Sequence, residues 1–508
     1  MKRTTEALLL GTLIAIAPVA ANVALAGGVA VVPVTVDPPG GGKAGPARIF
    51  GARNGSFSAQ IVAPAGSRAT VSGLSGPGKI PASAIAARYA HFDGPGKYPF
   101  FDGLHANPPA KPGTVQPIWV TVRVPRDAKA GEYKGSVSVG GTRIALELSV
   151  ADWTIPDPGE FATHVGLIQS PDSVALQYGV PMWSERHWKL MEKSFELLGG
   201  VGAKSIYIQV QRRTHFGNEQ SMVVWKKNGK GLEPDLSIVE KYVALAARHL
   251  GKVPVVCLYA WELDAADASH FPAGTPKSAR SKDREILISV RENGKLAEGK
   301  APAWGTPECR AFWKPVFSGV KSILAKHGMA DSMMVGITGD YTPSDTAVKD
   351  IAEASPGTKW GAHAHGRYDK VHGADVGLQV SVWGIHGLRD PASPCKWKWQ
   401  RHRYYGWKRG LPLTSFPRYG SIYGNAVGPL ARKRCSVLAM YRSLAEVAMT
   451  SQGQPKFNPG CNGFDRLGAD FWPVLKGKHK PSTICGRYPE AAWGQLTLNT
   501  ATPAFLAP

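Results

Sequence analysis

Cysteine is scarce in this chain, with six residues among 508. The sequence contains no Cys-x-x-Cys pair and no cysteine–histidine spacing typical of zinc sites. These absences exclude a scaffold built on disulfides and a zinc finger. Cys257 lies inside the apolar run VPVVCLYAW, and we interpret it as a buried thiol. The remaining late cysteines stand in loop-like surroundings that would permit bridges in an oxidising compartment: Cys395, Cys435, Cys461 and Cys485.

Long apolar runs are also missing after the N-terminus. Beyond residue 27 no stretch approaches the ~18 consecutive apolar residues that a membrane-spanning helix needs. Residues 1–27 have the pattern of a cleaved signal peptide: Lys2 and Arg3 precede a short apolar stretch, and Ala24-Leu25-Ala26 offers a cleavage site. We therefore expect a secreted or periplasmic protein with no membrane association after signal removal.

Acidic residues are outnumbered by basic ones, 38 against 60, which gives a net charge of +22. Such a balance favours polyanionic partners, and outside a cell these would be sulfated or uronic polysaccharides. The stretch CKWKWQRHRYYGWKRG at 395–410 mixes basic and aromatic residues as single-stranded nucleic-acid sites do. Its expected helix, Trp397–Lys408, scatters both kinds of side chain around the helical wheel. We interpret it as a packed helix with a solvated basic rim, and we expect no nucleic-acid partner.

The first folded region is expected at 46–155, where apolar and polar residues alternate. Ile118, Val120, Val122 and Val124 share one strand face, and Gly and Pro turns separate the runs. This pattern predicts an antiparallel β-sandwich. We interpret the segment Gly73–Pro112, rich in Gly, Pro and aromatic residues, as long loops.

The second region is expected at 160–500, after the proline-punctuated segment ADWTIPDPGEF. Short apolar strands there alternate with amphipathic stretches, which predicts an α/β fold with a (β/α)8 TIM-like barrel. Residues 262–306 are too long for a simple connection and predict an inserted hairpin around ILISVRENGKL. The expected helices are near Ser184–Leu198, Leu236–Leu250, Pro307–Lys326 and Asp345–Ala354.

The predicted strands end in polar and aromatic residues. In parallel barrels the active site lies at the carboxyl ends of the strands. Aromatic rings stack on sugar rings, and amide, imidazole and carboxylate groups bind hydroxyls, so these strand ends fit a carbohydrate site. The alternative is that strand ends are polar simply because they meet water. The candidate residues are Gln209, Gln211, Trp261, Glu262, Asp340, Tyr341, His363, His365, Trp383, Arg418 and Tyr419.

Three sequence segments resemble a known family. RNGSFSAQIVA, PIWVTVRVPRDAKAGEYKGSVSV and WTIPDP are similar to the N-terminal sandwich of proteins related to glycoside hydrolase family 123. GFDRLGADFWPV at 463–474 is similar to a late-barrel segment of the same group. The resemblance extends from about residue 46 to the end. Relatives continue into another helix beyond the equivalent of LNTATPAFLAP, so if the chain ends there we expect a barrel that lacks this helix or closes differently.

The resemblance implies a catalytic Asp-Glu pair after a mid-barrel strand. In that family the Asp orients the N-acetyl group of a β-linked N-acetylgalactosaminide for attack on the anomeric carbon, and the Glu protonates the leaving oxygen. In GITGDYTPSD, Asp340 matches the orienting Asp, whereas Tyr341 stands where the family has Glu. Tyrosine, with a reference pKa of about 10, is a poor proton donor near neutral pH. Glu262 and Asp345 are the other candidates for the acid.

A His-x-His motif gives a competing interpretation. His363 and His365 would point to the same side of a strand, and Asp340 on the preceding strand could add a metal ligand. The set has fewer ligands than a zinc site needs, so we expect no metal and no cofactor. The leading prediction is a secreted glycoside hydrolase acting on an anionic or N-acetylhexosamine-containing polysaccharide. The alternatives are a non-catalytic carbohydrate-binding protein on a degenerate barrel and a metal-dependent hydrolase.

Overall fold

The structure of the protein is a computed structural model. It describes residues 28–32, 34, 42–92, 101–110, 113–161, 164–214, 218–229, 231–262, 283, 285–337, 343–364, 370–381, 413–415, 463–470, 473–474 and 482–483. The expected signal peptide at 1–27 and the expected helix Trp397–Lys408 lie outside these residues. Among the helices described, none is both long and apolar enough to cross a bilayer.

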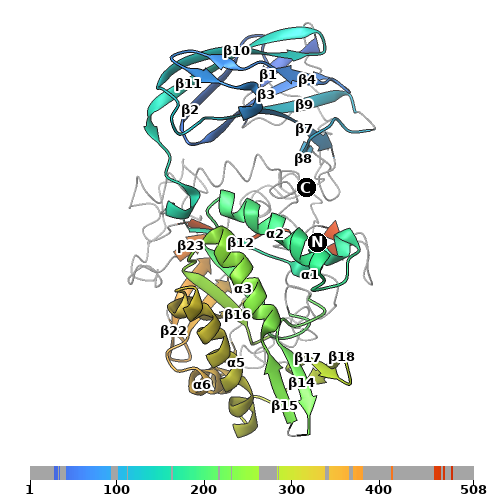
Figure 1. The fold of residues 1–508 in the computed structure, drawn as a ribbon, viewed down its shortest axis with the longest axis vertical. Coiled ribbons are helices and arrows are strands. Elements are labelled where there is room, and N and C mark those ends of the chain that lie inside the picture. Colours follow the sequence, from blue (N-terminus) through green and yellow to red (C-terminus); the bar gives the residue numbers. More distant parts are fainter. Residues whose placement is uncertain are drawn as a thin grey trace, which may run out of the picture.

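The N-terminal part, blue to cyan in Figure 1, consists of two β-sheets. One has the order β1-β3-β9-β7-β8, and the other has the order β2-β11-β10-β5-β6 with β4 paired to β10. Buried residues of both sheets form one apolar core, which explains the alternation in the sequence. The strands are β1 (Ala30–Val32), β2 (Ala47–Arg53), β3 (Ser56–Pro64), β4 (Ala69–Val71), β5 (Leu74–Ser75), β6 (Lys79–Ile80), β7 (Ile85–Phe92), β8 (Phe101–His105), β9 (Val115–Arg123), β10 (Gly131–Val139) and β11 (Thr142–Thr154).

Three details of this part differ from the prediction. The segment Gly73–Pro112 is not only loops, because it includes β7 and β8, and β7 pairs along β9. The sequence of β7, IAARYAHF, is rich in alanine, and its apolar and polar residues do not alternate clearly. The pairing of β2 with β11 is parallel, so the sheets are not wholly antiparallel. Strand β1 also joins β3, although it precedes the expected boundary at residue 46.

The α/β part, green to orange in Figure 1, is built on a parallel sheet. The strand order is β12-β24-β23-β22-β20-β19-β16-β13, with the short β21 paired to β22. Val165 of β12 also makes a parallel bridge to Ala203, just before β13, so the two end strands of this order meet. The strands are β12 (His164–Ile168), β13 (Ser205–Gln209), β16 (Val255–Tyr259), β19 (Met333–Ile337), β20 (Lys359–Ala364), β21 (Lys370–Val371), β22 (Ala374–Ser381), β23 (Leu413–Ser415) and β24 (Gly463–Gly468).

Helices connect these strands, and their observed bounds confirm the four sequence predictions within about two residues. Most begin at a hydroxyl side chain that accepts a hydrogen bond from a backbone amide in the first turn, as Ser184, Thr306 and Ser344 do. The helices are α1 (Pro171–Tyr178), α2 (Glu185–Gly200), α3 (Ser237–Leu250), α5 (Pro307–Lys326) and α6 (Asp345–Ala354). Their apolar faces and the strands form one core that includes Cys257, a buried thiol as predicted.

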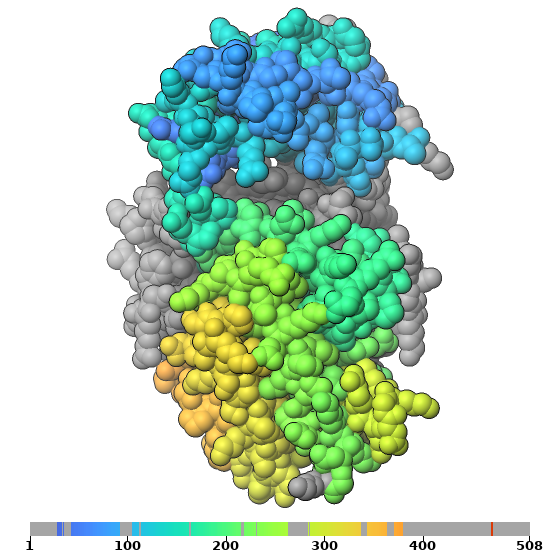
Figure 2. All heavy atoms as spheres, viewed as in Figure 1, coloured from blue at the N-terminus to red at the C-terminus, as the bar shows by residue number. Residues whose placement is uncertain are grey.

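A second, four-stranded sheet lies at the lower right of the α/β part in Figures 1 and 2. It combines β14 (Val224–Asn228) and β15 (Gly231–Asp235), which follow β13, with β17 (Leu287–Glu292) and β18 (Lys295–Lys300), which follow β16. The β17–β18 pairing confirms the predicted hairpin. Parallel pairing of β14 with β17 joins the two insertions into one sheet.

Candidate active site

Parallel pairing places the carboxyl ends of the strands at the same edge of the sheet. Among the residues described there, the ends of β13 and β16 lie next to each other because Gln209 pairs with Tyr259. Four predicted site residues lie at or just after the ends of these two strands: Gln209, Gln211, Trp261 and Glu262. The structure therefore brings together the first four of the eleven candidate residues.

The two glutamines are buried and carry backbone contacts. The carbonyl of Gln209 accepts a hydrogen bond from the amide of Met222 at 2.8 Å. The side-chain amide of Gln211 donates to the carbonyl of Ala260, next to Trp261. Gln211 therefore ties the end of β13 to the end of β16, a structural role that the sequence analysis did not assign.

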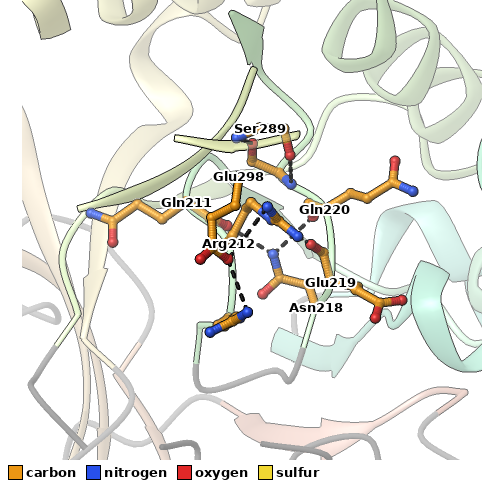
Figure 3. Close-up of polar contacts among 9 residues, drawn as sticks. Gln211, Arg212, Asn218, Glu219, Gln220, Ser289 and Glu298 are labelled. Atoms are coloured by element: carbon orange, nitrogen blue, oxygen red, sulfur yellow. Dashed lines mark hydrogen bonds and ion pairs between the residues drawn. The ribbon is translucent and has the colours of Figure 1, made fainter. Parts of the chain in front are cut away.

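The loop after Gln211 is fixed by one buried asparagine. The Asn218 side chain donates to the carbonyls of Gln211 and Gln220, at 2.8 and 2.9 Å, and accepts from the Thr214 amide at 3.0 Å. Figure 3 shows this cluster beside β17 and β18, with the side chain of Gln211 pointing away from it. These hydrogen bonds hold Gln211, Thr214 and Gln220 around the Asn218 side chain.

Arginine side chains extend this contact to the hairpin. The Arg212 amide donates to the Leu287 carbonyl at 2.8 Å, and its Nε donates to the Glu219 carbonyl at 2.7 Å. The Glu298 carboxylate lies 3.4 Å from Arg212 and 3.0 Å from Arg213 (Figure 3). Arg212 and Arg213 both pair with Glu298, so these ion pairs hold the segment after β13 against the β17–β18 hairpin.

Trp261 is buried at the end of β16, with 4% of its surface exposed. Its indole Nε1–H donates to Oδ1 of Asp283 at 2.7 Å. The same Oδ1 accepts from the backbone amide of Ser344 at 3.1 Å, and Oδ2 accepts from the Ser344 hydroxyl. Asp283 thus joins the end of β16 to the start of α6. No sequence pattern singles out Asp283, because it lies in an insertion among several other charged residues.

Glu262, the next residue after Trp261, is partly exposed. It is the one carboxylate-bearing residue among the predicted site residues that lies in the described part of the chain. A carboxyl group that reaches solvent at a strand end can exchange protons during a reaction. Asp345, the other acid considered, lies on the first turn of α6 and pairs with Lys349 at 2.7 Å, which lowers the pKa of its carboxyl. This pairing argues against Asp345 as a proton donor, because a donor near neutral pH needs a raised pKa.

Of the other seven candidate residues, His363 alone lies in the described part of the chain. His363 lies on β20, where its backbone pairs with Val380 of β22. The remaining predicted residues lie outside the described part of the chain: Asp340, Tyr341, His365, Trp383, Arg418 and Tyr419. No cluster of three or more potential metal ligands occurs among the residues that the structure describes.

A buried carboxyl group, that of Asp470, lies two residues after the end of β24. The carboxylate of Asp470 accepts a hydrogen bond from the Ser170 amide at 2.5 Å. Burial raises the pKa of this carboxyl to about 6, and hydrogen bonds from Ser170 and Ser194 oppose the increase. Asp470 therefore carries a proton under mildly acidic conditions.

Comparison with known proteins assigns this arrangement to a class. Residues 169–371 match the family model "Glycoside hydrolase 123, catalytic domain", and residues 101–141 match "Glycoside hydrolase 123 N-terminal domain". These two stretches are thus similar to glycoside hydrolases. More narrowly, they make the chain a family 123-like protein, which agrees with the resemblance seen in the sequence.

Solved structures give the fold a counterpart. A family 123 glycoside hydrolase from Clostridium perfringens, described in terms of glycolipid glycan hydrolysis, has a TM-score of 0.58 at 14% identity. The match covers 77% of this chain and 71% of that one. An amylomaltase from Corynebacterium glutamicum matches at 11% identity over 34% of this chain and 22% of its own, with a TM-score of 0.15 that supports no argument. No curated protein sequence matches the chain.

Proposed function

We propose that the protein is an exported hydrolase that cleaves N-acetylhexosamine residues from extracellular glycans. The observation that carries this proposal is the catalytic-domain match over residues 169–371, which spans Gln209, Trp261, Glu262, Asp340 and His363. The Clostridium perfringens enzyme acts on glycolipid glycans, which makes such glycans the first substrates to test. The net charge of +22 favours anionic glycans among them.

The catalytic part is proposed to be a closed (β/α)8 barrel. Two facts support this: the parallel strands neighbour one another in chain order, and the Val165–Ala203 bridge connects the two end strands. Closure would bring the ends of β12 and β13 to the same rim as β19 and β20. The two predicted domains, 46–155 and 160–500, are retained as proposals, with β1 added to the first.

The proposed mechanism uses the substrate's own N-acetyl oxygen as nucleophile. Asp340 would orient that group, and the bond from the anomeric carbon to the leaving oxygen would break as a proton reaches the oxygen. Glu262 is the proposed donor, because it is the partly exposed carboxyl group beside Trp261. Water then opens the resulting oxazoline ring and restores the N-acetyl group. Tyr341 is the competing donor because it occupies the position of the family's Glu.

The test is a glycan screen with residues 28–508. N-acetylhexosaminides, glycolipid glycans and sulfated or uronic polysaccharides are incubated with the wild-type protein and with Asp340→Asn. We expect the wild type to release N-acetylhexosamine. The rate of release by the variant should be at least about 100-fold lower. Release that Asp340→Asn leaves unchanged would refute the role of Asp340.

A second candidate function is glycan binding without cleavage. The presence of Tyr341 at the position where the family has its acidic Glu favours it. In that case glycans bind in an affinity assay, no sugar is released from any of them, and Trp261→Ala weakens the binding.

A further inference from the structure

The carboxylate of Asp283 lies between two parts of the candidate active site that are distant in sequence. It accepts hydrogen bonds from the Trp261 indole at 2.7 Å and from the Ser344 amide at 3.1 Å, and its second oxygen accepts from the Ser344 hydroxyl. Hydrogen bonds to an ionised acceptor are stronger than those between neutral groups. Asp283 is therefore well placed to hold both partners in one arrangement.

Each partner matters for its position. Trp261 lies two residues after the end of β16 and is buried, and the hydrogen bond from its N–H to Asp283 restrains the orientation of its ring. Ser344 is the N-cap of α6, and its hydroxyl oxygen accepts from the Ala347 amide at 3.0 Å. Asp340 is four residues earlier in the chain. A carboxylate beside the first turn of α6 is also favoured by the helix dipole.

A histidine holds the residue that precedes Ser344. Nε2 of His372 lies 2.9 Å from the Pro343 carbonyl and donates to it. His372 stands in the turn between β21 and β22 with a positive φ of 44°. The entrance to α6 is thus fixed from the insertion after β16 and from the β21–β22 turn.

We propose that Asp283 is a positioning residue of the glycosidase site, which sets the Trp261 ring against the start of α6. This inference rests on the proposed function for its catalytic consequence, but the hydrogen-bonded link itself does not. The bond partners also specify the effect of substitution. Asp283→Ala removes every acceptor, whereas Asp283→Asn keeps one carbonyl oxygen for Trp261 and the Ser344 amide and places an NH2 group beside the Ser344 hydroxyl.

Activity measurements test the proposal through coupling. Asp283→Ala is expected to lower kcat/KM by roughly 10- to 100-fold, and Asp283→Asn to restore most of that loss. Trp261→Phe keeps a ring but removes the N–H. If Asp283 acts through Trp261, the losses of the two single variants do not multiply in Asp283→Ala/Trp261→Phe. Fully multiplicative losses, or an Asn variant as poor as the Ala variant, would overturn the proposal.

A matched control separates positioning from general destabilisation. Thr306 caps α5 through its hydroxyl, which accepts from the Cys309 amide at 3.1 Å, much as Ser344 caps α6. Thr306→Ala removes a helix cap without contacting Trp261. It is expected to retain wild-type kcat/KM. An equal loss of kcat/KM in Thr306→Ala and Asp283→Ala would contradict a positioning role for Asp283.

Two readouts without substrate keep the proposal testable if no glycan is cleaved. Hydrogen exchange should accelerate in residues 344–350 of Asp283→Ala and leave residues 307–313 unchanged. In ¹⁵N-tryptophan-labelled protein, the indole N–H signal that Trp261→Phe deletes should shift in Asp283→Ala. Glycan inactivity with these two changes refutes the proposed function alone. Unchanged exchange and an unmoved indole signal refute the link.

Discussion

Ser221 and Ser289 exchange hydrogen bonds. The amide of Ser221 donates to the Ser289 hydroxyl oxygen at 2.9 Å, and the amide of Ser289 donates to the Ser221 hydroxyl oxygen at 3.1 Å. Both residues are fully buried, and they belong to different insertions. The Ser221 hydroxyl donates its own hydrogen to the Val223 carbonyl at 2.6 Å. These contacts join the segment just before β14 to β17, beside the point where the two strands pair.

Ser289→Ala should therefore destabilise the protein. The variant leaves the buried Ser221 amide without its acceptor, a loss of about 1–3 kcal/mol in the free energy of unfolding. Chemical denaturation measures the change. Ser318→Ala is the control, because the Ser318 hydroxyl is exposed on α5 and bonds only to carbonyls of its own helix. Equal stability of the two variants would contradict the assigned role of Ser289.

Glu262→Gln distinguishes the two proposed proton donors. If Glu262 is the acid, the variant hydrolyses glycans with poor leaving groups about 100-fold or more slowly than the wild type. It loses much less on p-nitrophenyl glycosides, whose leaving group needs little protonation. Tyr341→Phe, assayed with the same two substrates, should show no such dependence. A uniform loss for Glu262→Gln across leaving groups would exclude it as the acid.

His187 should make the protein less stable in acid. Its Nδ1 accepts from the Trp183 amide at 2.9 Å, and Nε2 lies 2.9 Å from the Pro171 carbonyl, so the ring is held neutral. Burial lowers the pKa of His187 to about 4, and the Pro171 carbonyl opposes this. His187 binds a proton more tightly in the unfolded chain than in the folded protein. The contribution of the neutral His187 ring to the free energy of unfolding is therefore complete above pH ~6.5 and declines as the pH falls toward 4.

His187→Ala measures that contribution. At pH 7.5 it is expected to cost about 2–4 kcal/mol, because a buried donor and a buried acceptor lose their partner. The difference from wild type should narrow by up to about 3 kcal/mol between pH 6.5 and 4. His187→Gln, which can keep one donor and one acceptor, should retain more stability. A difference that stays constant with pH would contradict the neutral assignment.

Asp470 has the opposite pH dependence. Because the pKa of Asp470 is raised to about 6, the folded state binds its proton more tightly than the unfolded chain does. Its contribution to stability is full below pH ~3.9 and is lost as the pH rises through about 6. Asp470→Asn imitates the protonated form and keeps an acceptor for the Ser170 amide. The variant should equal or exceed the wild type at pH 7 by up to about 3 kcal/mol, measured by urea unfolding, and lose this advantage at pH 4.

Local sequence patterns predicted much of the fold. Helices such as α5 and α6 have amphipathic periodicity and hydroxyl caps at Thr306 and Ser344, so their limits could be read within two residues. Strand β7 was missed because its alanines fit either a loop or a strand. The parallel pairing of β2 with β11 depends on segments almost 100 residues apart, for which a single sequence contains no signal.

The candidate site was predicted less completely, for a related reason. Trp261 and Glu262 follow an apolar strand, and strand ends are visible as a change from apolar to polar residues. Asp283 acquires its role from Ser344, which is 61 residues later, and from Trp261, which is 22 residues earlier. No local pattern marks such a residue, because the contacts arise only when the insertion folds back on the sheet.

The four-stranded sheet has a consequence for how such a protein can be changed. Since β14 pairs with β17, the connection after β13 and the connection after β16 are halves of one unit. Shortening either alone would expose an unpaired strand edge, a surface prone to aggregation. A relative with a different rim should therefore have gained or lost both segments together, and a chimera that transplants only one should express poorly.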